Sequence, residues 1–92
     1  IINSWQQTLT GLKNIQPGWQ NLKLFPQYYD KYKQEIDRIN EIISLRISRI
    51  EAIVSRMESN QWLTPQEQEF TYQDETLAQE QINLADKLNK VY

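Results

Sequence analysis

The chain has 92 residues, of which 39 % are apolar and 24 % charged, and its formal net charge is −2. This length allows one hydrophobic core rather than two. The absence of cysteine and histidine excludes thiol nucleophiles, disulfides, histidine acid–base catalysis and nearly all zinc sites. Nucleic-acid binding requires a concentrated basic surface, which this composition does not supply. We therefore expect no nucleic-acid partner, no metal and no cofactor.

No apolar run approaches the roughly 18–20 residues that a membrane-spanning helix needs. The sequence begins at Ile1 and not at Met. We therefore expect residues before it in the full protein. These could be a cleaved export signal, a further domain or a trimmed extension, and the sequence leaves all three open.

Residues 1–15 predict a short amphipathic helix. Its apolar residues recur at spacings of three and four: Ile2, Trp5, Leu9 and Leu12. The pair Pro17-Gly18 then predicts a turn. Residues 16–26 predict an irregular connection that packs its apolar side chains onto the helices. These side chains are Trp19, Leu22, Leu24 and Phe25.

Residues 27–59 predict one long helix, because neither proline nor glycine interrupts them. At about 1.5 Å per residue, such a helix is about 50 Å long. Its apolar stripe has the 3,4 spacing of a heptad: Tyr29, Tyr32, Ile36, Ile39, Ile43, Ile50, Ile53 and Met57. Arg46 occupies the one position of this stripe that lacks an apolar residue.

The segment Thr64-Pro65-Gln66-Glu67 predicts a helix start. Thr64 can accept a free N–H of the first turn, Pro65 has the preset φ, and Glu67 can reach back to the Thr64 N–H. We expect this helix over residues 65–91. Its stripe is Phe70, Leu77, Leu84, Leu88 and Val91, with the polar Asp74 and Gln81 at the intervening positions.

The short connection at residues 60–63 forces the last helix to pack antiparallel to the long one. The predicted fold is therefore all-α: an antiparallel helical hairpin with a short N-terminal helix, forming a three-helix up-down-up bundle. We expect residues 1–92 to form a single domain.

Aromatic residues are the best candidates for partner binding, because they bury much area with few torsions to freeze. Trp62 lies in the short connection at the hairpin tip, where burial in the core is hard to arrange. We place Leu63, Tyr28 and Tyr29 with it as candidate partner-binding residues. Trp5 and Trp19, in contrast, are predicted to plug the core.

Three arginines form a basic seam on the long helix: Arg46, Arg49 and Arg56. They can pair with acids of the antiparallel last helix, which is the ordinary arrangement of helix surfaces. Alternatively, they can bind an anionic partner. Both interpretations remain open. The acids of residues 67–80 otherwise predict a solvated face.

Residues 35–46 resemble the opening helix of the all-helical chorismate mutases. That resemblance implies a site in which several cations converge on a dicarboxylate substrate. Between Met57 and Asp86, however, there is neither lysine nor arginine, and a dianion bound without these cations would lack compensation. We therefore expect no catalytic residues, and we retain a divergent enzyme of this type as an alternative.

Several elements of the sequence follow one another in a recognisable order: Gly11-Leu12, Leu22, Tyr28-Tyr29, the Ile-rich residues 36–54, and Trp62-Leu63-Thr64-Pro65-Gln66-Glu67. This order resembles helical proteins of the transfer regions of Bacteroides-type conjugative elements and, more distantly, exported subunits associated with type IV secretion pili. The resemblance implies a non-enzymatic component of a DNA-transfer apparatus in the periplasm or cell envelope, acting through protein contacts.

Taken together, these features favour a non-catalytic helical module for protein interaction or structure. A second alternative is a self-assembling coiled-coil element. In that case the stripe over residues 29–57 would be partly exposed in the monomer, because the polar middle of the last helix covers it poorly.

Overall fold

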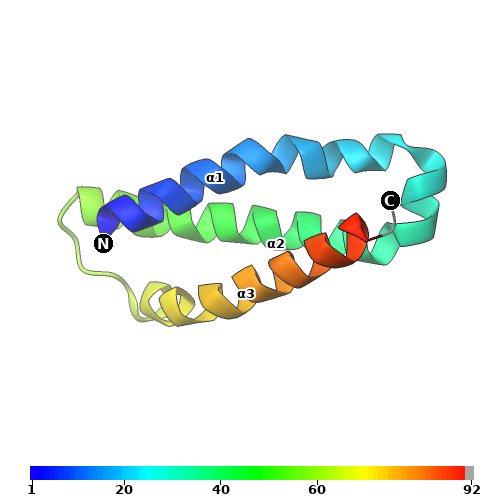
Figure 1. The fold of residues 1–92 in the computed structure, drawn as a ribbon. Helices are drawn as coiled ribbons and strands as arrows, with labels where there is room; N and C mark the ends of the chain where they lie inside the picture. The colour runs from blue at the N-terminus through cyan, green and yellow to red at the C-terminus, as the bar shows by residue number, and fades with distance from the viewer. Residues whose placement is uncertain (91–92) are drawn as a thin grey trace.

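The computed structural model describes residues 1–90, which form three α-helices and one short 3₁₀ helix. The helices are α1 (Ile2–Asn21), α2 (Pro26–Glu58) and α3 (Pro65–Asn89), with η1 (Leu22–Leu24) between α1 and α2. They form a rod of 48 × 20 × 17 Å in which α2 lies between α1 and α3 (Figure 1). The all-α class and the three-helix arrangement are confirmed.

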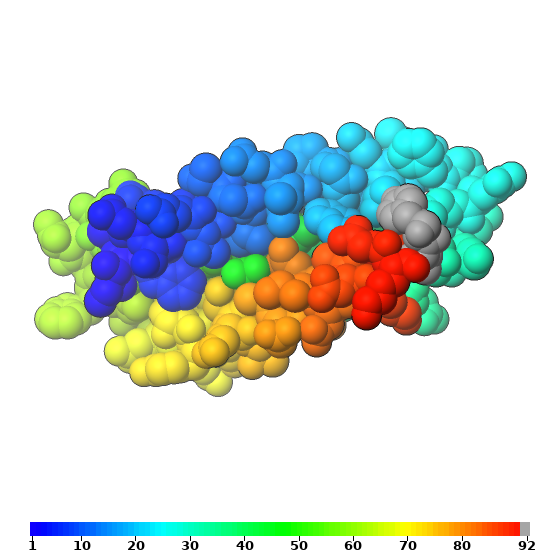
Figure 2. Space-filling model, in the orientation of Figure 1, coloured from blue at the N-terminus to red at the C-terminus, as the bar shows by residue number. Residues whose placement is uncertain are grey.

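The core is built around α2, whose isoleucines point toward both neighbouring helices. Leu12 of α1 and Phe70 of α3 complete its main cluster. Six isoleucines of α2 have no exposed surface: Ile36, Ile39, Ile42, Ile43, Ile50 and Ile53. Apart from its two ends, α2 is visible only in the gap between α1 and α3 (Figure 2). The self-assembly alternative required an apolar stripe that is partly exposed in the monomer. For residues 36–53 this expectation is wrong.

The first helix is longer than the sequence predicted, because α1 continues through Pro17 to Asn21. Gly18 has no positive φ, so the expected turn at Pro17-Gly18 and the connection beginning at residue 16 are wrong. Proline removes one helical hydrogen bond. The apolar spacing nevertheless continues from Leu12 to Trp19, which packs against the core as expected. Tertiary packing thus overrides the local turn signal.

The junction of α1 and α2 is only partly packed. Trp19 and Leu22 are half-buried, whereas Leu24 and Phe25 are 74 % and 60 % exposed. Packing of these last two side chains onto the helices was therefore a wrong expectation. The tight η1 helix turns the chain within three residues, which leaves Leu24 and Phe25 on the outside of the bend.

The long helix α2 begins at Pro26 and ends at Glu58, close to the predicted bounds of residues 27–59. A local kink interrupts it at Tyr32, where φ is −119° and ψ is 28°. The ring of Tyr32 packs against that of Tyr28, one helical turn earlier, with the two centroids 5.0 Å apart.

The capping box at the start of α3 is confirmed. The Glu67 N–H donates to Thr64 Oγ1 at 3.1 Å, and the Thr64 N–H donates to Glu67 Oε1 at 2.8 Å. Pro65 is the first residue of the helix. The helix ends at Asn89, and the predicted seam position at Val91 lies outside the described residues.

Candidate functional site

Arg46 sits inside the protein in a hydrogen-bonded group with two residues of α3. Its Nε and Nη2 donate to Asp74 Oδ1 at 2.7 Å and Oδ2 at 3.1 Å, and its Nη1 donates to Gln81 Oε1 at 2.8 Å. The Arg46 and Asp74 side chains are only 8 % and 9 % exposed. The three polar residues that interrupted the predicted apolar seams therefore meet one another. Arg46 is consequently a structural residue, and its guanidinium is not available to a partner.

Arg56 also pairs with an acid of the last helix, as the ordinary interpretation of the basic seam predicted. Its Nε forms an ion pair with Glu67 Oε1, the carboxylate that also caps α3. This hydrogen bond, together with those from Thr64, holds the pKa of the Glu67 carboxyl below its ordinary value. Arg56 therefore fastens the hairpin close to its tip.

A third arginine, Arg38, fastens α2 to the other half of α3. Its Nε and Nη2 donate to Glu80 Oε2 and Oε1 at 2.7 and 2.9 Å, and Nη1 donates to Glu41 at 2.7 Å. The bidentate contact lowers the pKa of Glu80 and raises that of Arg38. Arg38 was not among the site residues predicted from the sequence. The sequence pattern that places it on one stripe of the long helix with the other arginines is the spacing of seven, four and seven residues along Arg38, Leu45, Arg49 and Arg56.

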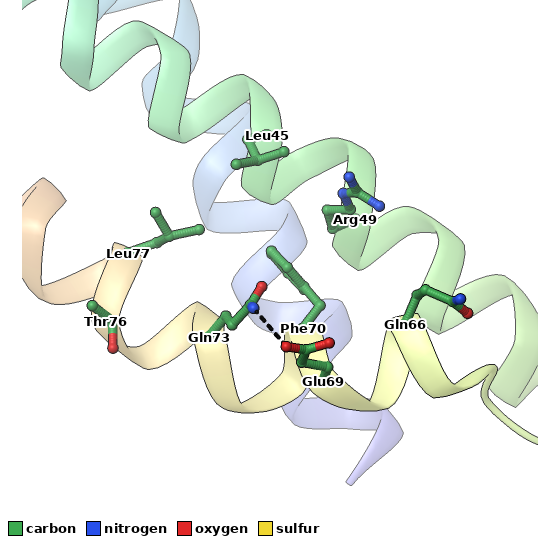
Figure 3. A pocket seen from close by; sticks show the side chains of 8 residues that line it. All are labelled: Leu45, Arg49, Gln66, Glu69, Phe70, Gln73, Thr76 and Leu77. Atoms are coloured by element: carbon green, nitrogen blue, oxygen red, sulfur yellow. Dashed lines mark hydrogen bonds between the residues drawn. The ribbon is translucent and has the colours of Figure 1, made fainter.

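Arg49 differs from these three arginines. It is exposed, and among residues 1–90 it forms no ion pair. It lines a groove of about 520 Å³ between α2 and α3 (Figure 3). The remaining lining residues are Leu45, Gln66, Glu69, Phe70, Gln73, Thr76 and Leu77. Arg49 is therefore the one residue of the predicted basic seam that is available to a partner.

The groove has apolar and polar parts. Phe70 is buried, and Leu45 and Leu77 are half-buried, whereas Gln66, Glu69, Gln73 and Thr76 are exposed along the α3 wall. Six lining residues from Gln66 to Leu77 share one side of α3 with helical spacing. At about 1.5 Å per residue, the groove follows roughly 16 Å of that helix.

The hairpin tip presents Trp62 to solvent, and its side chain is 94 % exposed. Leu63, its neighbour, is half-buried and packs against the core. The tip backbone is held by bonds from the Asn60 N–H to the Met57 carbonyl at 3.2 Å and from the Gln61 N–H to the Arg56 carbonyl at 2.9 Å. Asn60 takes a positive φ of 54°, which asparagine tolerates well. Trp62 is thus displayed on a well-anchored turn.

The tyrosine pair at the start of α2 lies at the opposite end of the rod from the hairpin tip (Figure 1). Tyr28 and Tyr29 are both half-buried. The Tyr29 hydroxyl donates to Asp37 Oδ1 at 2.6 Å, and this bond raises the pKa of Tyr29. The structure therefore does not bring these tyrosines together with Trp62 and Leu63, and the predicted partner-binding residues fall into separate regions.

The segment that resembles a chorismate mutase helix has both of its arginines engaged. Arg38 contacts Glu80 and Glu41, and Arg46 contacts Asp74. A dicarboxylate would have to displace these carboxylates. Within residues 1–90, no cluster of acidic side chains could hold a metal ion, and no helix is long and apolar enough to span a membrane.

No family model matches the chain, and no curated protein or solved structure is significantly similar to it. The resemblance to conjugal-transfer proteins therefore stays a prediction that rests on the sequence elements that carry it.

Proposed function

We propose that this chain is a non-catalytic helical module that binds a protein partner through the tip of the α2–α3 hairpin. The observation that carries this proposal is the 94 % exposure of Trp62. Tryptophan is among the residues that contribute most to binding when they are buried in an interface. Leaving so large an apolar side chain in water forgoes a gain in free energy that a docking partner would recover.

This gain is a substantial share of a binding free energy, and further contacts must offset the cost of association. Burial of a tryptophan removes roughly 200 Å² from water, which at about 25 cal/mol per Å² is on the order of 5 kcal/mol. The anchored backbone reduces the entropy that docking would cost. Leu63 holds the turn on the core, and the capping box together with Arg56 fixes the first turn of α3.

A crosslinking experiment tests whether the tip contacts a partner. A photoreactive aromatic amino acid replaces Trp62 in cells that make the protein, and a second variant carries it at Tyr72. Tyr72 is a matched control because it is an aromatic residue that is 78 % exposed and lies two turns into α3, outside the tip connection. We expect a discrete crosslinked protein from position 62 and none of that mass from position 72.

Affinity for the captured partner then measures the contribution of the tip. Trp62→Ala should weaken binding by about 30-fold or more, as expected for an interface residue worth about 2 kcal/mol. Tyr72→Ala should change it less than about threefold, and both variants should keep their helicity by circular dichroism. Equal weakening by the two substitutions, or no crosslink from position 62, would contradict docking through the tip. Loss of helicity in Trp62→Ala would make Trp62 a structural residue.

The sequence resemblance supplies a setting for this module: we propose a conjugative DNA-transfer apparatus of the cell envelope. The segment from Trp62 to Glu67, which carries part of the resemblance, includes the exposed tryptophan. Transfer frequency of an element encoding Trp62→Ala should fall relative to one encoding Tyr72→Ala at equal protein levels. Unchanged transfer on deletion of the whole gene would contradict this setting without affecting partner binding at the tip.

A further inference from the structure

Two exposed residues of opposite charge line the α2–α3 groove on its opposite walls. Arg49 stands on the α2 wall and Glu69 on the α3 wall (Figure 3). Neither forms an ion pair within residues 1–90, and Glu69 only accepts a hydrogen bond from Gln73 Nε2 at 3.3 Å. Arg38 and Arg56 on the same stripe of α2 both reach acids of α3. Arg49 lies between Arg38 and Arg56 on this stripe, so the surface ion pairs between α2 and α3 are interrupted at the groove.

This pair of charges is complementary to itself. A two-fold axis through the groove, midway between Arg49 and Glu69, places Arg49 of one copy over Glu69 of the other and repeats the contact in reverse. Such reciprocal pairing is the property of an isologous two-fold interface. We propose that the occupant of the groove is a second copy of this chain, so that two α2–α3 hairpins pack face to face.

The remaining lining residues fit this arrangement. Face-to-face packing of two helical hairpins produces a four-helix bundle, whose interior takes side chains from all four helices. The half-buried Leu45 and Leu77 would then be covered. Gln66, Gln73 and Thr76 each carry donors and acceptors, and the two-fold axis places them over α2 of the second copy.

The full long side of the 48 × 20 Å rod is roughly 960 Å². Stable interfaces bury roughly 800 Å² per partner, so the dimer contact must extend along most of this side, beyond the groove itself. Because Arg49 and Glu69 are exposed, their contacts in the dimer should respond to salt. Interactions between exposed charges are largely screened beyond about 10 Å at 0.1 M salt and beyond about 3 Å at 1 M. This dimer does not depend on Trp62, which lies outside the groove.

Charge reversal provides a test with an internal rescue. Arg49→Glu and Glu69→Arg each place like charges against one another twice in the dimer. Each variant alone should therefore associate at least about tenfold more weakly in sedimentation equilibrium. An equimolar mixture of the two variants satisfies both pairs again, as does the double variant R49E/E69R. Both should recover dimerisation.

Glu75→Arg is the matched control, since Glu75 is an exposed acid of α3 that does not line the groove. It should dimerise like the natural chain, as should Trp62→Ala, which separates this proposal from docking through the tip. A natural chain that remains monomeric up to millimolar concentration overturns the proposal. A dimer that neither single reversal weakens, or that the mixture fails to restore, overturns it as well. Circular dichroism on every variant verifies that folding is intact.

Discussion

The two helices that pack on α2 are held by different forces. Against α1, the contact is mainly apolar. Its polar links are an exposed ion pair from Lys13 to Glu51 at 3.2 Å, a bond from Gln16 Nε2 to Ser44 Oγ at 3.2 Å, and a bond from Asn40 Nδ2 to the Trp19 carbonyl at 3.1 Å. Against α3, α2 uses a row of arginines that contact acids of that helix: Arg38, Arg46 and Arg56. The middle contact of this row is buried.

The difference determines how strictly each helix is positioned. Apolar burial is non-directional, so α1 can adjust along α2 at modest cost except near Trp19, whose carbonyl accepts a bond from Asn40. Charged hydrogen bonds require defined distances and angles. The α2–α3 contact therefore accepts few registers, because a slip of one turn would separate Arg46 from both Asp74 and Gln81. Substitutions that remove one partner of a charged pair should therefore weaken the α2–α3 contact most. Substitutions that leave a cavity should weaken the α1–α2 contact most.

The largest effect is expected from Asp74→Ala. It leaves the buried Arg46 guanidinium with Gln81 as its remaining partner, and an uncompensated buried charge costs about 3–5 kcal/mol of unfolding free energy. Chemical denaturation measures this loss. Asp86→Ala, at an exposed acid of the same helix, is the control and should change stability by less than about 0.5 kcal/mol.

Removal of the whole buried pair should behave differently from removal of one member. Replacing both Arg46 and Asp74 by leucine eliminates the charges together, and stability should return to near that of the natural chain or exceed it. A cost for Asp74→Ala no greater than that for Asp86→Ala would show that water reaches Arg46, and the contrast between the two faces of α2 would be lost.

On the α1 side, Leu12→Ala should cost about 2–4 kcal/mol by leaving a cavity in the core. Because no ion pair is involved, the loss should be the same at low and high salt. The neighbouring Gly11→Ala is the matched comparison: a Cβ there meets nothing within 4 Å, and the helix should gain about 0.5–1 kcal/mol. A Leu12→Ala cost below about 1 kcal/mol would indicate that α1 contributes little to the core.

Sequence periodicity was sufficient to predict the apolar contacts. The isoleucine stripe of α2 and the capping box of α3 could be predicted because both depend on residues within a few turns of each other. Pro17-Gly18 misled the prediction of α1, since the local turn signal opposed an apolar spacing that continued to Trp19. Only the packed structure shows which of the two effects is stronger.

The candidate sites were harder to predict, because they depend on how α3 is aligned against α2. Arg46 and Arg49 differ by three positions and therefore point about 60° apart around the helix. That rotation directs Arg46 to the buried Asp74 and Arg49 to the open groove. In the sequence, the two appeared as one basic seam. The exposure of Trp62 could be predicted from its place in a short connection. The unpaired charges of the groove could be identified only from the folded structure.

The smallest expected effect concerns the ion pair between Arg38 of α2 and Glu80 of α3. It is a change in how the free energy of unfolding depends on pH. Arg38 lowers the pKa of Glu80 in the folded protein. Its contribution is therefore complete above the carboxyl's ordinary pKa of about 4.5 and is lost as pH falls through the lowered value. Glu80→Gln removes this charge, so its unfolding free energy should decline less between pH 6 and pH 3 than that of the natural chain.

Glu75→Gln is the control for this titration, because Glu75 is an exposed acid on the same helix that forms no ion pair within residues 1–90. Its pH profile should run parallel to that of the natural chain. If Glu80→Gln also gives a parallel profile, the bidentate geometry does not survive in solution. The positioning of α3 would then depend on the buried bonds of Arg46 to Asp74 and Gln81 and on the ion pair at Arg56.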